Sequence, residues 1–156
     1  MRCDECGADP PGEEWCLDRF HALLATEDRN EELRRMHGLT VLTYHLQHPG
    51  LTKPWYQVFG REVMRRVFGR GEAWQAVLLE THPRGIGRRA DAVVARIKAA
   101  GPPTMPVWVV GTPIPGEATI AAVDLEAASG QERAILAWAR SVAAHRFLGH
   151  DSADGR

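Results

Sequence analysis

Three cysteines near the amino end carry the clearest chemistry in this sequence. Cys3 and Cys6 are separated by two residues and followed by Gly7, and Cys16 comes soon after them. Two thiolates at this spacing can hold one ion at about 2.3 Å, and the glycine allows a sharp turn behind them. Because three cysteines cannot all pair, the cluster is more typical of a metal or redox site than of a disulfide framework. We therefore predict a zinc knuckle within residues 1–16.

A structural zinc site is usually tetrahedral, so a fourth ligand is needed, and the histidines offer one. A helix predicted from about Asn30 to His48 carries His37, His45 and His48. His37 and His48 lie about 16 Å apart along its axis, so these two cannot bind one ion. His45 and His48 lie about 4.5 Å apart and could do so.

The preceding helix selects among these histidines. Its apolar residues recur at helical spacing from Leu17, and the helix is predicted to end between Thr26 and Asn30. A short turn joins it to the next helix, so the two should pack antiparallel, with Cys16 opposite the last turns of the second helix. The predicted ligand set is therefore Cys3, Cys6, Cys16 and His48, with His45 and then His21 as substitutes for His48.

The rest of the chain predicts a mainly α fold, a helical bundle that carries the amino-terminal zinc knuckle. Further helices are predicted over residues 54–68, 72–80, 88–100 and 131–147, the last with an apolar stripe of Ile135, Trp138, Ala139 and Val142. The segments 107–110 and 118–123 are predicted as the strands of one short β-hairpin near residues 107–123. We expect residues 1–150 to form a single domain, followed by a frayed tail at 151–156.

Composition bounds the class of protein. The chain has 156 residues, 44% hydrophobic and 25% charged, which excludes disorder throughout. No apolar run approaches the roughly 20 residues of a membrane-spanning helix, and the polar start lacks the pattern of a secretory signal, so we expect a cytoplasmic protein. The net charge of -1 argues against nucleic acid as a partner. Acidic side chains predominate in residues 1–32 and basic side chains in residues 53–98. This predicts two solvated faces of opposite charge that attract each other or, as the alternative, a basic face that binds a partner.

A longer pattern resembles an uncharacterised bacterial family, a domain of unknown function. That family has Cys-x2-Cys-Gly, a further Cys with a Phe-x2-Leu-Leu helix, and His-x-Leu-Thr-Val-Asp-x-Tyr-x2-Gln-His-Pro. The counterparts here are Cys3, Cys6, Gly7, Cys16, Phe20, Leu23, Leu24 and the stretch His37-Gly-Leu-Thr-Val-Leu-Thr-Tyr-His-Leu-Gln-His-Pro49. Leu42 replaces the family's Asp, which weakens a catalytic role at that position. The resemblance favours His48 and His37 over His21 and His45, and it implies no activity.

Three functions are compatible with this site. In the first, a structural Zn²⁺ pins the knuckle to the bundle, and the protein is a binding or regulatory module with a protein partner. In the second, the metal keeps an open position near His45 and His48, and the protein is a metal-dependent enzyme with acid–base candidates His37, Tyr44 and His45 and a carboxylate such as Glu27. In the third, the site is a zinc–thiolate redox switch, in which oxidation of Cys3 and Cys6 or Cys16 expels the ion. The sequence predicts no particular reaction.

Overall fold

The computed structural model describes residues 2–9, 15–52, 54–81, 113–127 and 129–148. All regular structure in these ranges is helical, which confirms the predicted mainly α fold. No helix among the described residues is long and apolar enough to cross a membrane. The helix predicted over 88–100, the strand predicted over 107–110 and the tail at 151–156 lie outside the described residues. That residues 1–150 form one domain stays a prediction.

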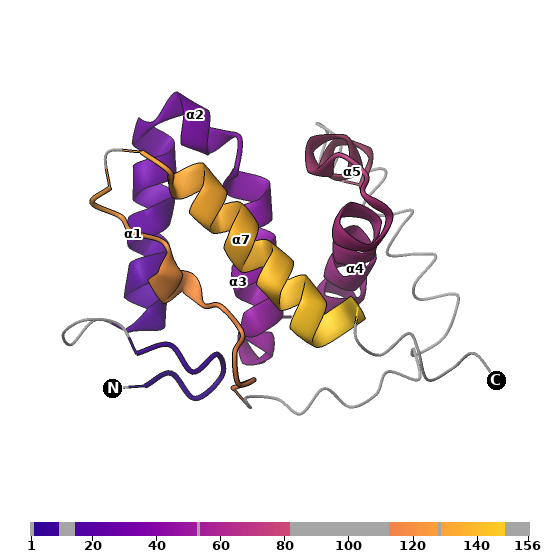
Figure 1. Cartoon of the computed structure of the whole chain (residues 1–156), viewed down its shortest axis with the longest axis horizontal. Helices are drawn as coiled ribbons and strands as arrows, with labels where there is room; N and C mark the ends of the chain where they lie inside the picture. Colours follow the sequence, from indigo (N-terminus) through magenta and orange to yellow (C-terminus); the bar gives the residue numbers. More distant parts are fainter. Residues whose placement is uncertain (1, 10–14, 53, 82–112, 128, 149–156) are drawn as a thin grey trace.

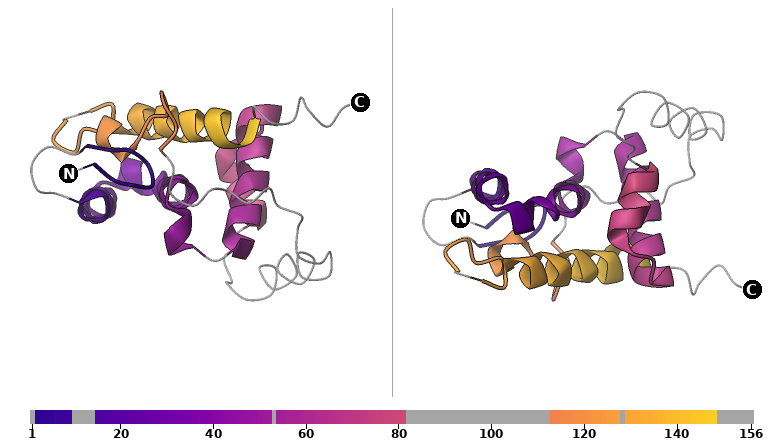
Figure 2. Two further views of the ribbon diagram at one scale, coloured as in Figure 1. Left: turned by 90° about the horizontal axis from the view of Figure 1, so that it is seen from below. Right: turned by 90° about the horizontal axis from the view of Figure 1, so that it is seen from above.

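The helices pack around a central one, α3. Figures 1 and 2 show α7 crossing α3, with α1 on one side of α3 and α4 on the other. The elements in chain order are α1 (Cys16–Arg29), α2 (Glu31–Arg34), α3 (His37–Gln47), the 3₁₀ turn η1 (Pro49–Leu51), α4 (Pro54–Met64), the π-helical turn η2 (Arg65–Gly69), α5 (Trp74–Thr81), the 3₁₀ turn η3 (Ile120–Ala122), α7 (Gln131–Ala143) and the π-helical turn η4 (Ala144–Leu148).

Asn30 joins the first two helices. Its backbone N–H donates to the carbonyls of Thr26 and Glu27, which ends α1. Its side-chain oxygen accepts from the N–H groups of Glu32 and Leu33, which begins α2 and confirms the predicted cap. The prediction of one continuous helix from here to His48 is wrong at residues 35–36. There the N–H of Met36 donates to Leu33 O at 2.7 Å, so the chain forms a tighter turn. The side chains of Leu33 and Met36 are both buried.

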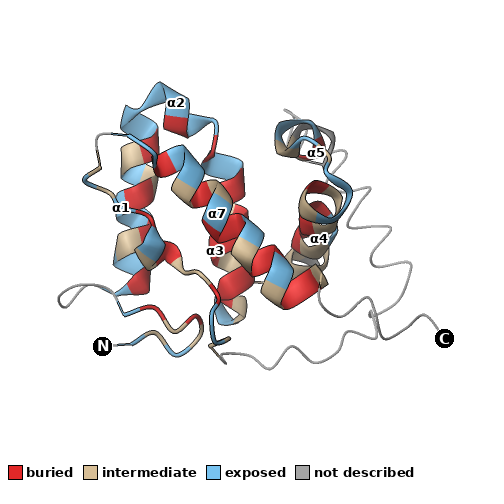
Figure 3. Cartoon of the chain, in the orientation of Figure 1, coloured by how far each residue is buried: buried red, intermediate tan, exposed pale blue. Residues whose placement is uncertain are grey.

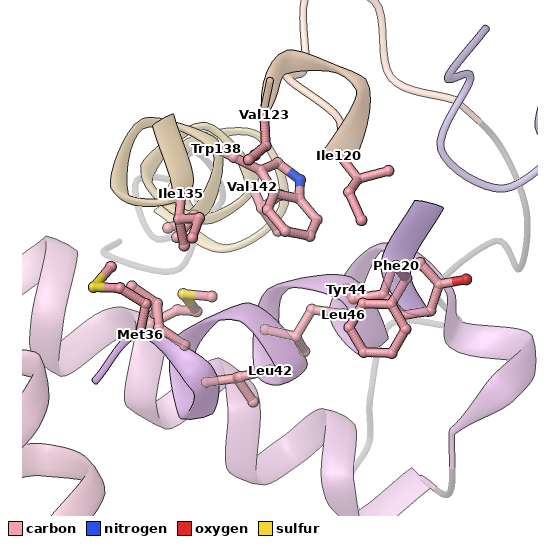
Figure 4. Close-up of a cluster of buried hydrophobic side chains, with 14 of the residues drawn as sticks. Phe20, Met36, Leu42, Tyr44, Leu46, Ile120, Val123, Ile135, Trp138 and Val142 are labelled. Carbon is pink, nitrogen blue, oxygen red and sulfur yellow. The ribbon is translucent and has the colours of Figure 1, made fainter. Parts of the chain in front are cut away.

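The core lies where α7 packs on α3 and where η3 packs between α7 and α1. Buried residues form a stripe along the inner faces of α1, α3 and α7 (Figure 3). In Figure 4 the indole of Trp138 points between η3 and α3, beside Val123, Val142 and Leu46. The four residues of the predicted stripe on α7 are each 0% exposed, so that prediction is confirmed. Full burial of one such large apolar side chain stabilises a fold by about 1.5–3 kcal/mol.

Gly60 lets α4 approach α3 closely. A Cβ at this position would lie 2.7 Å from Leu46 Cδ2 and 2.9 Å from Leu42 Cδ1, which is closer than carbon atoms can pack. A side chain there would push α4 away from the helix that ends beside His48.

Gln47 ties three segments together directly beside His48. Its side-chain oxygen accepts from Trp138 Nε1 at 2.7 Å, and its Nε2 donates to Ala118 O at 2.7 Å. Ala118 N in turn donates to Ser141 Oγ at 2.8 Å. These bonds satisfy polar groups inside the core, so they fix the end of α3 relative to α7 and to the segment before η3.

The strand predicted over residues 118–123 is wrong, because this segment forms the turn η3. Thr119 Oγ1 accepts from Ala121 N, which opens the turn. Ile120 and Val123 are 1% and 0% exposed, and their spacing of three residues matches a 3₁₀ turn and not the period of two that a half-buried strand shows. Arg19 Nη2 of α1 donates a hydrogen bond of 2.7 Å to the carbonyl oxygen of Val123.

Candidate metal centre

The knuckle is a tight turn formed by residues 3–8. Gly7 N donates to Cys3 O at 2.8 Å, and Cys3 N donates to Ala8 O at 2.7 Å. Gly7 has φ +76°, a conformation that favours glycine, and a Cβ on it would lie 2.8 Å from Pro113 Cβ. The turn brings the sulfur atoms of Cys3 and Cys6 to the same side, as a metal knuckle requires.

Four side chains from three segments converge at this turn. The ligand atoms of Cys3, Cys6, Cys16 and His48 all lie within 4.8 Å of one another, and no other such group occurs among the described residues. Cys3 Sγ lies 3.6 Å from His48 Nε2, and Cys6 Sγ lies 3.6 Å from Cys16 Sγ. Ligands about 2.3 Å from an ion at the centre of a tetrahedron would lie about 3.7 Å apart. The structure thus brings together the four predicted residues at spacings that could hold a metal ion.

Three segments of the chain position these residues, and Cys3 and Cys6 share the turn of the knuckle. Cys16 is the first residue of α1, and His48 is the residue that ends α3. Cys6, Cys16 and His48 are 2%, 6% and 2% exposed, whereas Cys3 is only half-buried. Bulk water therefore has little access to three of the four ligand atoms.

The imidazole of His48 is oriented by the backbone. Its Nδ1–H donates to Tyr44 O at 2.8 Å, which directs Nε2 at the sulfur of Cys3, 3.6 Å away. The ring is also stacked on Tyr44 at a centroid distance of 4.0 Å, and Tyr44 stacks on Phe20 of α1 at 3.9 Å. Such a carbonyl partner is the usual support of a metal-binding histidine.

In the absence of an ion, protons are shared unevenly among the three thiols. The hydrogen bond from Cys16 lowers the pKa of Cys6 to about 4. The same hydrogen bond, together with burial, raises the pKa of Cys16. Burial also raises the pKa of Cys3. Loss of a proton is therefore favoured at Cys6, and Ala8 N donates to that sulfur at 3.4 Å. A cation that takes all three sulfurs must displace protons from the other two.

A further hydrogen bond joins the knuckle to the chain after His48. Gly50 N donates to Glu5 Oε1 at 2.8 Å. Glu5 lies inside the Cys-x2-Cys spacing and Gly50 two residues after His48, so this bond holds the two halves of the cluster together without using a ligand atom. Sequence reasoning missed it, because an acidic residue in an exposed turn gives no signal of its partner.

The other three histidines predicted as possible ligands or acid–base groups lie outside the cluster. His21 is exposed on α1 and leans against Phe20. His45 packs edge-on against Phe20 and Tyr56, and its buried Nδ1 finds no hydrogen-bond partner in the described part of the chain. Burial lowers the pKa of His45. Tyr44, an acid–base candidate in the sequence, is buried, and burial raises the pKa of its hydroxyl group.

Glu27 supports His37 and not the cluster. Glu27 is 1% exposed, and it accepts a short hydrogen bond from Thr40 Oγ1 and one of 3.0 Å from His37 Nδ1. His37 and His48 stand at opposite ends of α3, about 16 Å apart along the axis. Burial raises the pKa of Glu27, although both hydrogen bonds oppose that shift.

This buried carboxyl gives the fold a pH dependence. Because its folded-state pKa lies above its ordinary value of 4.5, the stabilising contribution is complete below pH 4.5 and is lost as pH rises through the folded-state pKa. We therefore expect Glu27→Gln to gain stability relative to wild type as pH rises from 4.5 toward neutral. Urea unfolding at a series of pH values measures this difference. The matched control is Glu126→Gln at an exposed residue, and a difference that falls with pH would contradict the assignment.

Comparison with known proteins gives a family but no function. A family of unknown function, DUF5946, matches residues 1–146 of the chain, and this is the class of family that the sequence pattern resembles. No curated protein and no solved structure matches the chain.

Proposed function

The chain belongs to the DUF5946 family of unknown function, and we propose that this member is a cytoplasmic zinc protein whose ion is structural. In this proposal Cys3, Cys6, Cys16 and His48 bind one Zn²⁺ and hold the knuckle against the ends of α1 and α3. The protein then acts as a binding or regulatory module. The convergence of these four ligand atoms within 4.8 Å carries the proposal.

The donor set favours zinc over other divalent ions. Three sulfurs and one imidazole nitrogen suit Zn²⁺, whereas Mg²⁺ and Ca²⁺ prefer oxygen ligands. Four protein ligands also complete a tetrahedral site, so no position is left for a reacting water. The enzymatic alternative needs such an open position, and His45, its proposed neighbour, faces Phe20 and Tyr56 instead.

The surface beside the ligands supports a role in binding. Trp15, Leu17 and Leu51 are 57%, 42% and 55% exposed, and they are the large exposed hydrophobic residues of the described chain. Trp15 and Leu17 flank Cys16, and Leu51 follows His48 by three residues. An ion that fixes the backbone at Cys16 and His48 would therefore also fix these apolar side chains for a protein partner.

Metal analysis of the untagged protein tests the proposal. We expect one zinc per chain in the wild type and loss or strong weakening of binding in His48→Ala. His45→Ala is the matched control, because it removes the same side chain from the same helix outside the cluster, and it should keep its zinc. Equal zinc contents in the two variants, or a wild type without zinc when zinc is supplied, would refute the ligand set.

The coordination number is tested separately with cobalt. Four-coordinate Co²⁺ absorbs visible light much more strongly than Co²⁺ with additional water ligands. We expect the strong four-coordinate spectrum with sulfur-to-metal charge transfer. A weak spectrum that changes when small anions are added would indicate an open position and favour the enzymatic alternative.

A further inference from the structure

The three sulfur atoms of the cluster differ in their access to solvent. Cys3 is half-buried, whereas Cys6 and Cys16 are 2% and 6% exposed. A small oxidant that approaches the folded protein therefore meets Cys3 first. Thiolates are the reactive form of cysteine, and zinc keeps its sulfur ligands in that form.

The two buried sulfurs lie close enough to form a bond after a small shift. Cys6 Sγ and Cys16 Sγ lie 3.6 Å apart, and a disulfide needs about 2.05 Å, so a shift of about 1.5 Å brings them together. A Cys3–Cys6 bond would instead have to form inside the turn that Gly7 N and Cys3 N hold in shape. Burial also protects a Cys6–Cys16 disulfide from reduction better than a bond that includes Cys3.

From this arrangement we propose that the metal centre is a peroxide-sensitive switch in which Cys3 is oxidised first and a Cys6–Cys16 disulfide is the final product. The inference rests on the proposed zinc site, and it names how that site is regulated. The oxidant is a hydroperoxide such as H₂O₂.

The chemistry balances in three steps. The Cys3 thiolate attacks one peroxide oxygen, the O–O bond breaks, hydroxide leaves, and Cys3 becomes a sulfenic acid. The Cys16 thiolate then displaces hydroxide from the Cys3 sulfur and forms a Cys3–Cys16 disulfide. Finally the Cys6 thiolate attacks the Cys16 sulfur and the Cys3 thiolate leaves. Two thiolates have been oxidised, and one peroxide has been reduced to two hydroxide ions that take up protons. Only Cys3 and His48 would remain as ligands, so Zn²⁺ would be released.

This change would move the anchor of the knuckle from one helix to another. With zinc bound, the knuckle is held to α3 through His48 and to α1 through Cys16. After oxidation the covalent bond to Cys16 keeps the knuckle on α1, while the links to the end of α3 are the hydrogen bond between Glu5 and Gly50 and the contact between Cys3 and His48. The orientation of the knuckle over the end of α3 would therefore depend on the redox state.

The test treats the zinc-loaded full chain with H₂O₂ and follows zinc release with a coloured chelator. We expect one zinc per chain to be released and to rebind after dithiothreitol treatment. Mapping of unreduced peptides should find the Cys6–Cys16 disulfide and a free thiol at Cys3. Brief exposure in the presence of a dimedone-type probe should label Cys3 alone as the sulfenic acid.

The outcomes that overturn the switch differ from those that overturn the zinc site. Zinc that stays bound through peroxide treatment, a final Cys3–Cys6 disulfide, or a sulfenic acid at Cys16 each refutes the switch and leaves the zinc site standing. A protein that binds no zinc refutes the proposed function. The metal-free protein would then still show by peptide mapping whether peroxide links Cys6 to Cys16.

Discussion

Zinc-loaded protein is expected to resist urea better than metal-free protein by about 4 kcal/mol when free zinc exceeds its Kd about a thousandfold. The unfolded chain does not hold the four ligands together, so binding energy becomes folding energy. Urea unfolding with and without a chelator under reducing conditions measures the difference. Cys16→Ser should abolish it, and His45→Ala should keep it. Unfolding curves of the wild type that do not depend on zinc would contradict a structural ion.

The loss on metal removal should also be local. The hydrogen bonds of the knuckle, from Gly7 N to Cys3 O and from Cys3 N to Ala8 O, lack the support of a helix. Their amides should exchange quickly with solvent once the ion is gone. The amides of α7 should stay protected, because Trp138 and Val142 are 0% exposed on a helix that supplies no ligand. Hydrogen exchange monitored by mass spectrometry separates the two regions.

Glu117→Gln is expected to destabilise the fold by about 3–5 kcal/mol. The carboxylate of Glu117 accepts two bonds from Arg146, at 2.6 and 2.8 Å, and its side chain is 0% exposed. The amide would leave a guanidinium buried without its counter-charge. Urea unfolding at neutral pH measures the loss of free energy.

An exposed ion pair provides the control for this prediction. Arg34 and Asp28 lie 3.9 Å apart, with side chains 60% and 88% exposed. Asp28→Asn should therefore change stability by less than about 1 kcal/mol. A double variant, Glu117→Leu with Arg146→Met, should recover much of the lost stability, because apolar residues often replace a buried pair without loss. If Glu117→Gln lowered the free energy of unfolding by as little as Asp28→Asn, the buried pair would contribute little to stability.

The metal cluster was predictable because its geometry depends on regular elements. The spacing of Cys3 and Cys6 predicts a knuckle, and helical rise singles out the residues at one end of α3. The break at Met36 did not disturb this prediction, since His48 is positioned by the turns of α3 that immediately precede it. The metal itself stays a prediction.

The long-range polar contacts of the fold were not predictable, since they depend on tertiary packing. Glu117 and Arg146 are 29 residues apart and resemble any exposed charged residues in the sequence. Gln47 is bonded to Trp138, 91 residues later. The failed strand at 118–123 has a related cause: its apolar residues fit two periods, and only the packing of Ile120 and Val123 against the core decides between them.

His48 follows Cys3 by 45 positions, which has a consequence for how the protein is made. A ribosome adds about 5–20 residues each second, so all three cysteines exist for about 2–6 seconds before the histidine is synthesised. During that time the nascent chain carries three thiols that cannot form the complete centre. With the proposed ligand set, metal capture would therefore wait until α1 and α3 have paired. A peptide cut from the amino end would lack the histidine, so the centre cannot be moved into another protein as a short cassette.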